Sequence, residues 1–470
     1  MNQLGILDAS FLEIEDSVSH MHIGAVAIFE GPLPRYEALR DMVLGKLALV
    51  PRYRQVVRRI PLGAGRPVWI DYAHFNIDYH LRRTGLPAPG GEPELRRLVG
   101  RVMSHQLDRA RPLWEMWIVE GLDDGRWALL AKTHHCMVDG VSASELLTVM
   151  LDRQRRPERS AVEAWRPRSA PGAAELVSGA LAVGLRTSYR AGRELLAPRR
   201  LAERSQQAAR GLLRMRDVIQ PAPPSSLNGS IGPNRRWSLA RAQLSDIKTI
   251  RHALGGTIND VVLACITAGF RSLLLSRGEP VERVIRTLVP VSVRAPGERG
   301  IYDNRVSAIF AELPVGLDDP TLRLESIRVQ MEDLKRSEEA VAGEVLISLG
   351  GFAPPMLLAL AERLGTRVPQ HNVNTVTTNV PGPQYPLYAA GRRMLEVFGY
   401  VPLGAHIRLG VAIFSYDGAL TFGVTGDYET TADIDVLCEG IEEAIAELLA
   451  LCAPHAHPVT GARGPAGVRG

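Results

Sequence analysis

Short apolar runs with the two-residue period of strands alternate along the first 150 residues with longer segments of helical spacing. The strand-like runs are 20–30, 114–120 and 127–134, and the helical runs are 35–50 and 92–106. The last two strand-like runs are joined by Asp123-Asp124-Gly125, which favours a tight hairpin turn. A further helix is expected from Ser142, because Ser142 and Glu145 have the spacing of a capping box. The pattern predicts a mixed α/β fold.

The second half of the chain repeats this mixture. Its helical runs are 258–275, 322–339 and 433–451, and its strand-like runs are 284–293, 373–378, 407–416 and 419–425. In each half, an Asp-Gly hairpin leads through a strand and a short loop to a helix. The first loop carries His134-His135-Cys136-Met137-Val138-Asp139-Gly140, whereas the second carries Gly426-Asp427-Tyr428-Glu429 and no histidine. Two similar lobes with chemistry on one of them predict a site in the cleft between them.

A segment of different composition separates the halves. It begins rich in Arg and Pro, continues as an Ala/Leu/Arg helical pattern over 173–218, and ends in Pro221-Ala-Pro-Pro224. We therefore expect an N-terminal lobe (1–152), a helical linker (153–226), a C-terminal lobe (227–452) and a disordered Gly/Pro/Ala-rich tail (453–470). The arginines of the linker form either a basic surface for anionic lipid or an ordinary solvated helical face.

Composition and charge narrow the class of protein. The net charge is only +4 over 470 residues, which argues against a dedicated nucleic-acid binder. Four scattered cysteines without CxxC spacing argue against a zinc module or a disulfide framework and favour a reducing compartment. No signal-peptide pattern is visible. The longest uncharged run, between Glu344 and Glu362, contains Pro354-Pro355 and is 17 residues long. A spanning helix needs about 20 residues, so we expect the chain not to cross a membrane.

The histidine pair at the end of the 127–134 strand is the strongest chemical signal. Because side chains alternate along a strand, His134 and His135 face opposite sides, so one is expected to be structural and the other to reach a cleft. Asp139 follows four residues later, and Gly140 suits a turn with unusual backbone angles. An imidazole near neutral pH suits general-base catalysis. The alternative is that both histidines are ordinary core or loop residues.

Other catalytic templates fit less well. The chain has no Gly-x-Ser-x-Gly elbow and no phosphate-binding P-loop. Cys136 is a conceivable nucleophile, but its side chain points away from that of His135 and nothing local lowers its pKa. His134, His135 and Asp139 lack a second ligand cluster of recognisable spacing, so no metal is expected.

The sequence His134-His135-x-x-x-Asp139-Gly140 resembles the active-site signature of the bacterial wax ester synthase/acyl-CoA:diacylglycerol acyltransferases (WS/DGAT). This family belongs to the CoA-dependent acyltransferase superfamily, which includes chloramphenicol acetyltransferase and condensation domains. Further motifs fall in the family's order: Leu4-Gly-Ile-Leu-Asp8-Ala-Ser-Phe11-Leu12, His20-Met-His-Ile-Gly24, Pro112-Leu113-Trp114, Thr257-Ile-Asn259-Asp260-Val261, Pro290-Val-Ser-Val-Arg294, Asn379-Val-Pro381-Gly382-Pro383 and Ser415-Tyr-Asp-Gly418. Tyr302-Asp303-Asn304 departs from the expected Gly-Asn pair, which concerns the local turn more than the chemistry.

The resemblance implies two chloramphenicol-acetyltransferase-like lobes, each a mixed sheet packed with helices, with the active site in a tunnel between them. It assigns His135 as the general base, His134 as its support, and no acyl-enzyme intermediate. Asp139 would hold the loop through an arginine, with Arg294 as the candidate and Arg52 or Arg54 as substitutes.

Asn259 would stabilise the oxyanion or position the base, with Asp260, Gly140 and Arg294 as structural support; an alternative for Asn259-Asp260 is a helix cap. Pro112, Trp114, Asn379, Pro381 and Gly382 are candidates for the substrate tunnel. The Asn379–Pro383 turn is alternatively a purely structural corner.

The implied function is transfer of a long-chain acyl group from acyl-CoA to diacylglycerol or to a long-chain alcohol. No cofactor is expected beyond acyl-CoA as co-substrate, and no nucleic-acid partner. We expect a cytoplasmic protein peripherally associated with the inner membrane or with lipid inclusions, through 180–216 and 345–361. The alternatives are a condensation-type or natural-product acyltransferase with another acceptor and a non-enzymatic protein of lipid-droplet surfaces.

Overall fold

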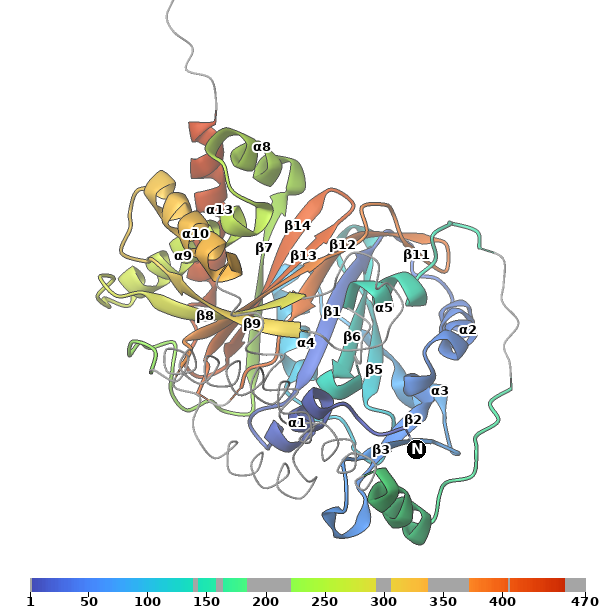
Figure 1. The fold of residues 1–470 in the computed structure, drawn as a ribbon. Coiled ribbons are helices and arrows are strands. Elements are labelled where there is room, and N and C mark those ends of the chain that lie inside the picture. Colours follow the sequence, from blue (N-terminus) through green and yellow to red (C-terminus); the bar gives the residue numbers. More distant parts are fainter. Residues whose placement is uncertain are drawn as a thin grey trace, which may run out of the picture.

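Two six-stranded sheets lie side by side, each with its own helices (Figure 1). The computed structural model describes residues 2–137, 143–157, 164–183, 221–292, 306–336, 372–404 and 406–452. The strand orders are β11-β12-β1-β6-β5-β4 in the first sheet and β7-β14-β13-β10-β8-β9 in the second. This arrangement confirms the predicted α/β fold of two lobes.

The first lobe contains both helices and strands predicted for it. Its elements are α1 (Ile6–Ile14), β1 (His22–Phe29), α2 (Tyr36–Lys46), β2 (Gln55–Arg58), β3 (Val68–Asp71), α3 (Ile77–His80), β4 (Leu81–Gly85), α4 (Glu92–Met103), β5 (Trp114–Glu120), β6 (Trp127–His134) and α5 (Ala143–Met150). Between β5 and β6, Asp124 and Gly125 have φ values of 55° and 67°. Both residue types tolerate this left-handed conformation, which explains why the hairpin was predictable with its observed bounds.

Four helices of the second lobe pack with its sheet around one apolar core. The elements are β7 (Arg235–Gln243), α8 (Leu244–Leu254), α9 (Ile258–Ser276), β8 (Ile285–Ser292), β9 (Val306–Leu313), α10 (Pro320–Arg336), β10 (Thr375–Pro381), β11 (Tyr388–Ala389), β12 (Arg392–Tyr400), β13 (Leu409–Tyr416), β14 (Ala419–Asp427) and α13 (Ile434–Leu451). Helix α9 lies at the centre of this core. In the part of the chain described, α9 is also the one helix long and apolar enough to cross a membrane, but 72% of its most apolar window is buried inside the protein. A core helix passes the same test.

The two sheets share a four-strand pattern. In the first, β4 is parallel to β5, β5 is antiparallel to β6, and β6 is antiparallel to β1. In the second, β10 is parallel to β13, β13 is antiparallel to β14, and β14 is antiparallel to β7. The similarity predicted between the halves is therefore present in the topology. His134 ends β6, and Asp427 occupies the equivalent end of β14.

Strands β11 and β12 join the sheet of the other lobe. Residues 388–400 lie within the segment assigned to the second lobe, yet β12 pairs with β1, with Gly24 opposite Tyr400. Where β12 crosses β14, a Cβ on Gly423 would overlap the carbonyl of Gly399. Two glycines thus allow the backbones to touch, and the crossing joins the two lobes closely.

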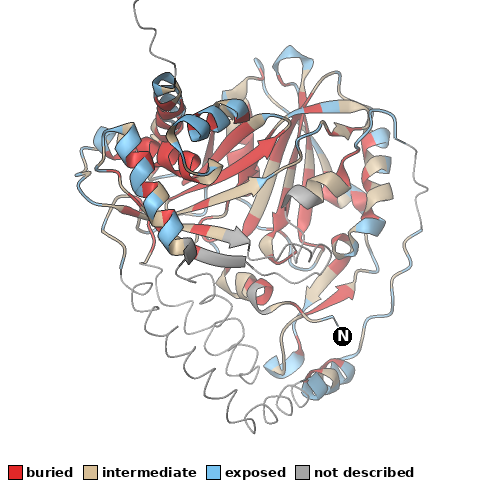
Figure 2. Cartoon of the chain, turned by 45° about the horizontal axis from the view of Figure 1, so that its top comes forward, coloured by how far each residue is buried: buried red, intermediate tan, exposed pale blue. Residues whose placement is uncertain are grey.

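Residues 164–183 of the linker lie on the first lobe, whereas its described end, 221–226, contacts the second lobe, where Ser226 is hydrogen-bonded to Arg277 and Glu279. The helix Ala173–Val183 places Leu176 and Ala180 in one apolar cluster with Ile60 and Val68. The buried and exposed faces of the described elements are shown in Figure 2. The remainder of the predicted linker helix, the apolar run 345–361 and the tail 453–470 lie outside the described residues.

Candidate active site

The histidine pair stands at the C-terminal end of β6, where the backbone is held from both sides. The amide of His134 donates to the carbonyl of Leu113 at 2.9 Å, and that of His135 donates to the carbonyl of Met21 at 2.8 Å. His134 is wholly buried. His135, in the short 3₁₀ turn His135–Met137, is partly exposed. His134 is thus internal and His135 partly exposed, and the turn that begins at His135, rather than the strand itself, directs the second ring.

The ring of His135 is stacked on that of Phe11, with centroids 3.9 Å apart and planes inclined by 25°. Loss of solvation lowers the pKa of His135 to about 4, although the residue's own backbone, close to the ring, opposes this shift. Nδ1 has no hydrogen-bond partner among the described residues. At neutral pH the imidazole is therefore uncharged, which is the form that accepts a proton.

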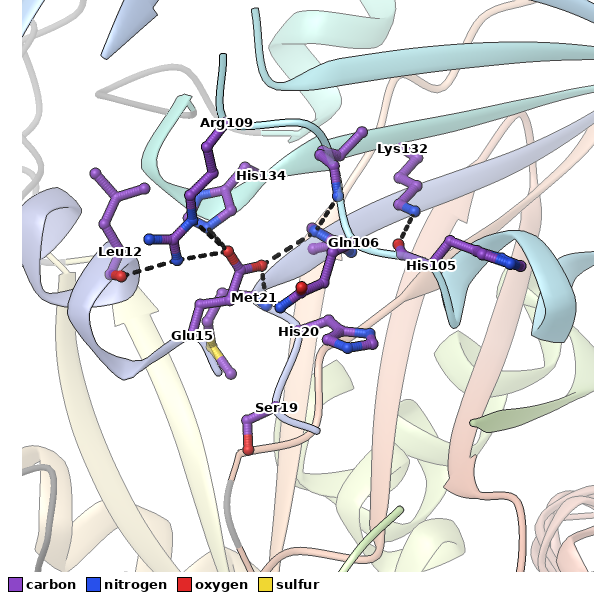
Figure 3. Close-up of polar contacts among 12 residues, drawn as sticks. Leu12, Glu15, Ser19, His20, Met21, His105, Gln106, Arg109, Lys132 and His134 are labelled. Carbon is purple, nitrogen blue, oxygen red and sulfur yellow. Dashed lines mark hydrogen bonds and ion pairs between the residues drawn. The ribbon is translucent and has the colours of Figure 1, made fainter. Parts of the chain in front are cut away.

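His134 belongs to a buried polar cluster behind the pair (Figure 3). Its Nδ1 accepts a hydrogen bond from the amide of Cys136 at 3.2 Å, and its Nε2 lies 3.5 Å from Glu15 Oε2. Glu15 also contacts His22 and Arg109, at 3.2 and 2.6 Å. Glu15 and Arg109 were not expected from the sequence, in which His134 and the His20-Met-His motif mark the cluster.

The loop residues Asp139 and Gly140 lie outside the described residues, and so does Arg294, the expected partner of Asp139. Their roles stay predictions. The two substitutes proposed for Arg294 both stack on tryptophans. The guanidinium of Arg52 lies 4.7 Å from the ring centre of Trp69, and that of Arg54 lies 4.5 Å from that of Trp165.

Asn259 lies in the first turn of α9, and the cap of this helix is made by its neighbours. Thr257 and Asp260 form a reciprocal capping box, with N···O distances of 2.8 and 3.3 Å. The alternative role expected for Asn259-Asp260, a helix cap, is therefore filled by Asp260 and not by Asn259. The Oδ1 of Asn259 instead accepts a hydrogen bond from Asn379 Nδ2 at 3.2 Å. The structure thus brings together two of the asparagines selected from the sequence.

Of the remaining residues expected to line the substrate tunnel, some are buried in the core and one is exposed. Trp114 is 1% exposed and is stacked between Tyr53 and His80, at centroid distances of 4.7 and 4.6 Å. Pro112 is buried beside it, whereas Pro381 is exposed. Gly382 packs so closely on β13 that a Cβ would overlap the carbonyl of Ser415 and the ring of Phe414. These contacts show structural roles for Trp114 and Gly382, and their contact with substrate stays a prediction.

The histidine turn and the end of β10 belong to one packed region. Cys136 and Met137 share an apolar cluster with Phe414 of β13, and Val380, next to Asn379, packs against the same cluster. Helix α5, which follows the histidine loop, is in contact with β10. The candidate site therefore lies where the two lobes meet.

Two other chemistries find no support in the described part of the chain. Burial raises the pKa of the Cys136 thiol well above its ordinary value, so this sulfur is a poor nucleophile at neutral pH. Among the described residues no group of three or more His, Cys, Asp or Glu side chains is arranged to hold a metal ion.

Comparison with known proteins agrees with this geometry. The family model described as the wax ester synthase/diacylglycerol acyltransferase catalytic domain matches residues 4–262, and that of the WS/DGAT C-terminal domain matches 302–449. A probable diacylglycerol O-acyltransferase of Mycobacterium tuberculosis is 38% identical over 466 residues, or 96% of each chain. A solved wax ester synthase/diacylglycerol acyltransferase of Marinobacter aquaeolei VT8 matches with a TM-score of 0.68 and 27% identity, covering 96% of this chain and 100% of that one.

More distant solved structures share the fold alone. The first condensation domain of the calcium-dependent antibiotic synthetase has a TM-score of 0.59 at 18% identity, and the match covers 96% of each chain. This similarity agrees with the two-lobe fold that the family resemblance implies.

Proposed function

Because the chain belongs to the WS/DGAT family of acyltransferases, we propose that it transfers a long-chain acyl group from acyl-CoA to the hydroxyl of diacylglycerol, with His135 as the general base. The observation that carries the proposal is the uncharged, partly exposed imidazole of His135 at the junction of the two lobes. A neutral imidazole there is ready to accept a proton from an alcohol.

In the proposed step, Nε2 of His135 removes the acceptor's hydroxyl proton as the oxygen attacks the thioester carbonyl. A C–O bond forms, and the carbonyl oxygen becomes an oxyanion. Collapse of this intermediate breaks the C–S bond, and the imidazolium returns its proton to the departing CoA sulfur. The reaction balances without an acyl-enzyme, in keeping with the buried, protonated thiol of Cys136.

Asn259 is the candidate donor to the oxyanion. Its Oδ1 is engaged by Asn379, so the planar amide is fixed and its Nδ2 points the other way. A fixed donor of this kind is typically worth about 3 kcal/mol in the transition state, because it need not reorient during the reaction.

Diacylglycerol is proposed as the principal acceptor and a long-chain alcohol as the second. The relative at 38% identity is named for diacylglycerol, whereas the Marinobacter enzyme, at 27%, is named for both products. A condensation-type acceptor has weaker support, since those structures are only 19% identical or less.

The test offers palmitoyl-CoA with dioleoylglycerol or hexadecanol and measures CoA release together with the lipid product. Replacement of His135 by Ala should lower the rate by about 10²- to 10⁴-fold, the usual contribution of a general base. His252→Ala on α8, an exposed histidine bonded to the carbonyl of Lys248, is the matched control and should retain full activity. Equal activity of the two variants would refute His135 as the base.

Long-chain substrates partition into lipid, so we further propose that the enzyme is cytoplasmic and works at the inner membrane or at lipid inclusions. The support is the chemistry of the substrates together with the arginine-rich composition of 180–216. Flotation with anionic and neutral vesicles, with wild type and a variant lacking several of these arginines, tests it. Equal flotation of both proteins would remove this segment as the contact surface.

A further inference from the structure

Helix α1 contacts both members of the histidine pair. Phe11 lies on its last turns and is stacked on His135, and Glu15, immediately after the helix, lies 3.5 Å from the Nε2 of His134. Residues four apart project from the same side of a helix, so one face of α1 reaches both rings. Neither contact is needed for the proton transfers described above.

Both carboxylate oxygens of Glu15 have polar partners inside the protein. Its side chain is only 2% exposed. Oε1 accepts from the amide of Met21 at 3.3 Å and lies 3.2 Å from His22 Nε2. Oε2 accepts from Arg109, whose guanidinium also donates to the carbonyl of Leu12 at 2.9 Å. In Figure 3 the carboxylate points toward Arg109 and His134. It therefore ties α1 to the ends of β1 and β6.

Glu15 is ionised in this setting. Burial alone would raise the pKa of its carboxyl, but the imidazoles of His134 and His22 beside it outweigh burial and hold the pKa below its usual range. The Arg109 guanidinium supplies the compensating positive charge. The Nε2 of His134 faces this carboxylate at 3.5 Å but makes no hydrogen bond with it.

The amide of Cys136 selects one tautomer of His134. Because it donates to Nδ1 at 3.2 Å, Nδ1 carries no proton, and the ring proton is on Nε2, which faces Glu15 at 3.5 Å. That amide belongs to the peptide bond directly after His135. The orientation of the His134 ring therefore helps to fix the backbone next to His135.

We propose that Phe11 and Glu15 form a two-point brace by which α1 positions His135. Phe11 acts directly, by stacking on the His135 ring. Glu15 acts indirectly, through the His134 ring and its hydrogen bond with the Cys136 amide. The inference rests on the proposed function, in which His135 is the base. Phe11 and Glu15 are positioning residues, because neither takes part in the bond changes.

Glu15→Gln is the principal test, since it removes the charge and keeps the size. Glu13→Gln is the matched control: Glu13 lies in the last turn of α1, two residues before Glu15, and pairs at 2.8 Å with Arg59, which is 57% exposed. Glu15→Gln should lower kcat by about 10- to 100-fold, as for groups that orient metal-bound histidines, and leave KM for palmitoyl-CoA within about twofold. Glu13→Gln should change neither.

A second comparison separates positioning from general structural support. Introduced into the His135→Ala variant, Glu15→Gln should lower the residual rate no further, because the group that it positions is gone. An equal fold-decrease in both backgrounds would overturn the proposal, and so would equal kcat values for Glu15→Gln and Glu13→Gln.

Phe11→Leu tests the other contact and remains informative if Glu15→Gln fails to fold. It keeps an apolar side chain but removes the stacked ring, so kcat should fall while the thermal midpoint changes little. Wild-type kcat in Phe11→Leu would overturn the stacking half of the brace. If His135→Ala itself were fully active, the proposed function would fail instead, so the two failures are distinguishable.

Discussion

Asn379 Nδ2 donates to Asn259 Oδ1 across 3.2 Å, linking the end of β10 to the first turn of α9. The two residues are 120 positions apart in the chain. The bond orients the amide of Asn259, so the contribution of Asn379 to catalysis should be made through Asn259.

This relationship predicts non-additive substitutions. Asn259→Ala should lower kcat by about 100-fold, the effect of losing one oxyanion donor. Asn379→Ala should lower it less, since the amide loses its anchor but remains present. The double variant should match Asn259→Ala alone, as measured by initial rates of CoA release. Multiplicative effects would show that the two asparagines act independently.

The low pKa of His135 predicts a flat pH profile on the acid side. Only the neutral imidazole acts as a base, so activity is lost as pH falls through its pKa, which burial lowers from 6.5 to about 4. The value of kcat/KM should therefore stay within about twofold between about pH 5.5 and 7.5, whereas a base with an ordinary pKa would lose about tenfold at the lower pH. Initial rates with a fixed vesicle composition measure this. An inflection near pH 6.5 would contradict the lowered pKa of His135.

At Gly382, the close packing predicts that one added methyl group lowers the stability of the fold. Its amide donates to Ser415 Oγ at 3.2 Å, and an added Cβ would overlap the Ser415 carbonyl and the Phe414 ring. Gly382→Ala should destabilise the fold by about 1–3 kcal/mol, the usual effect of overpacking. Gly172→Ala is the control, because a Cβ there meets nothing within 4 Å. Thermal unfolding of both variants compares them, and equal midpoints would show that the turn moves freely.

Local signals account for what the sequence could predict. The hairpins β5–β6 and β13–β14 and the helix α9 were found because their turns and cap lie within a few residues of each element. Strand β12 was missed, since it is defined by pairing with β1, far away in the chain, and its own sequence mixes polar and apolar residues.

The same distinction holds at the site. His135 and Asn259 were selected from motifs, and that selection required only their neighbours in the sequence. Glu15 was missed, because its meaning depends on His134 and Arg109, which approach it only in the folded protein. A carboxylate after an amphipathic helix is ordinarily a solvated residue, so no sequence pattern marks it as buried.

Trp114 offers a test of whether a candidate tunnel residue serves the core. Its Nε1 donates to the carbonyl of Tyr53 at 2.8 Å, and its ring is stacked between Tyr53 and His80. Trp114→Phe keeps an aromatic ring but leaves that carbonyl without its donor, at a cost of about 1–3 kcal/mol. The thermal midpoint should fall by a few degrees, and the preference among acyl-CoA chain lengths should not change.

Trp117→Phe is the control, on the same strand but only half-buried. It should lower the midpoint less, because the Nε1 of Trp117 donates to the Glu115 side chain. A changed chain-length preference in Trp114→Phe, at an unchanged midpoint, would instead place this ring against the acyl chain.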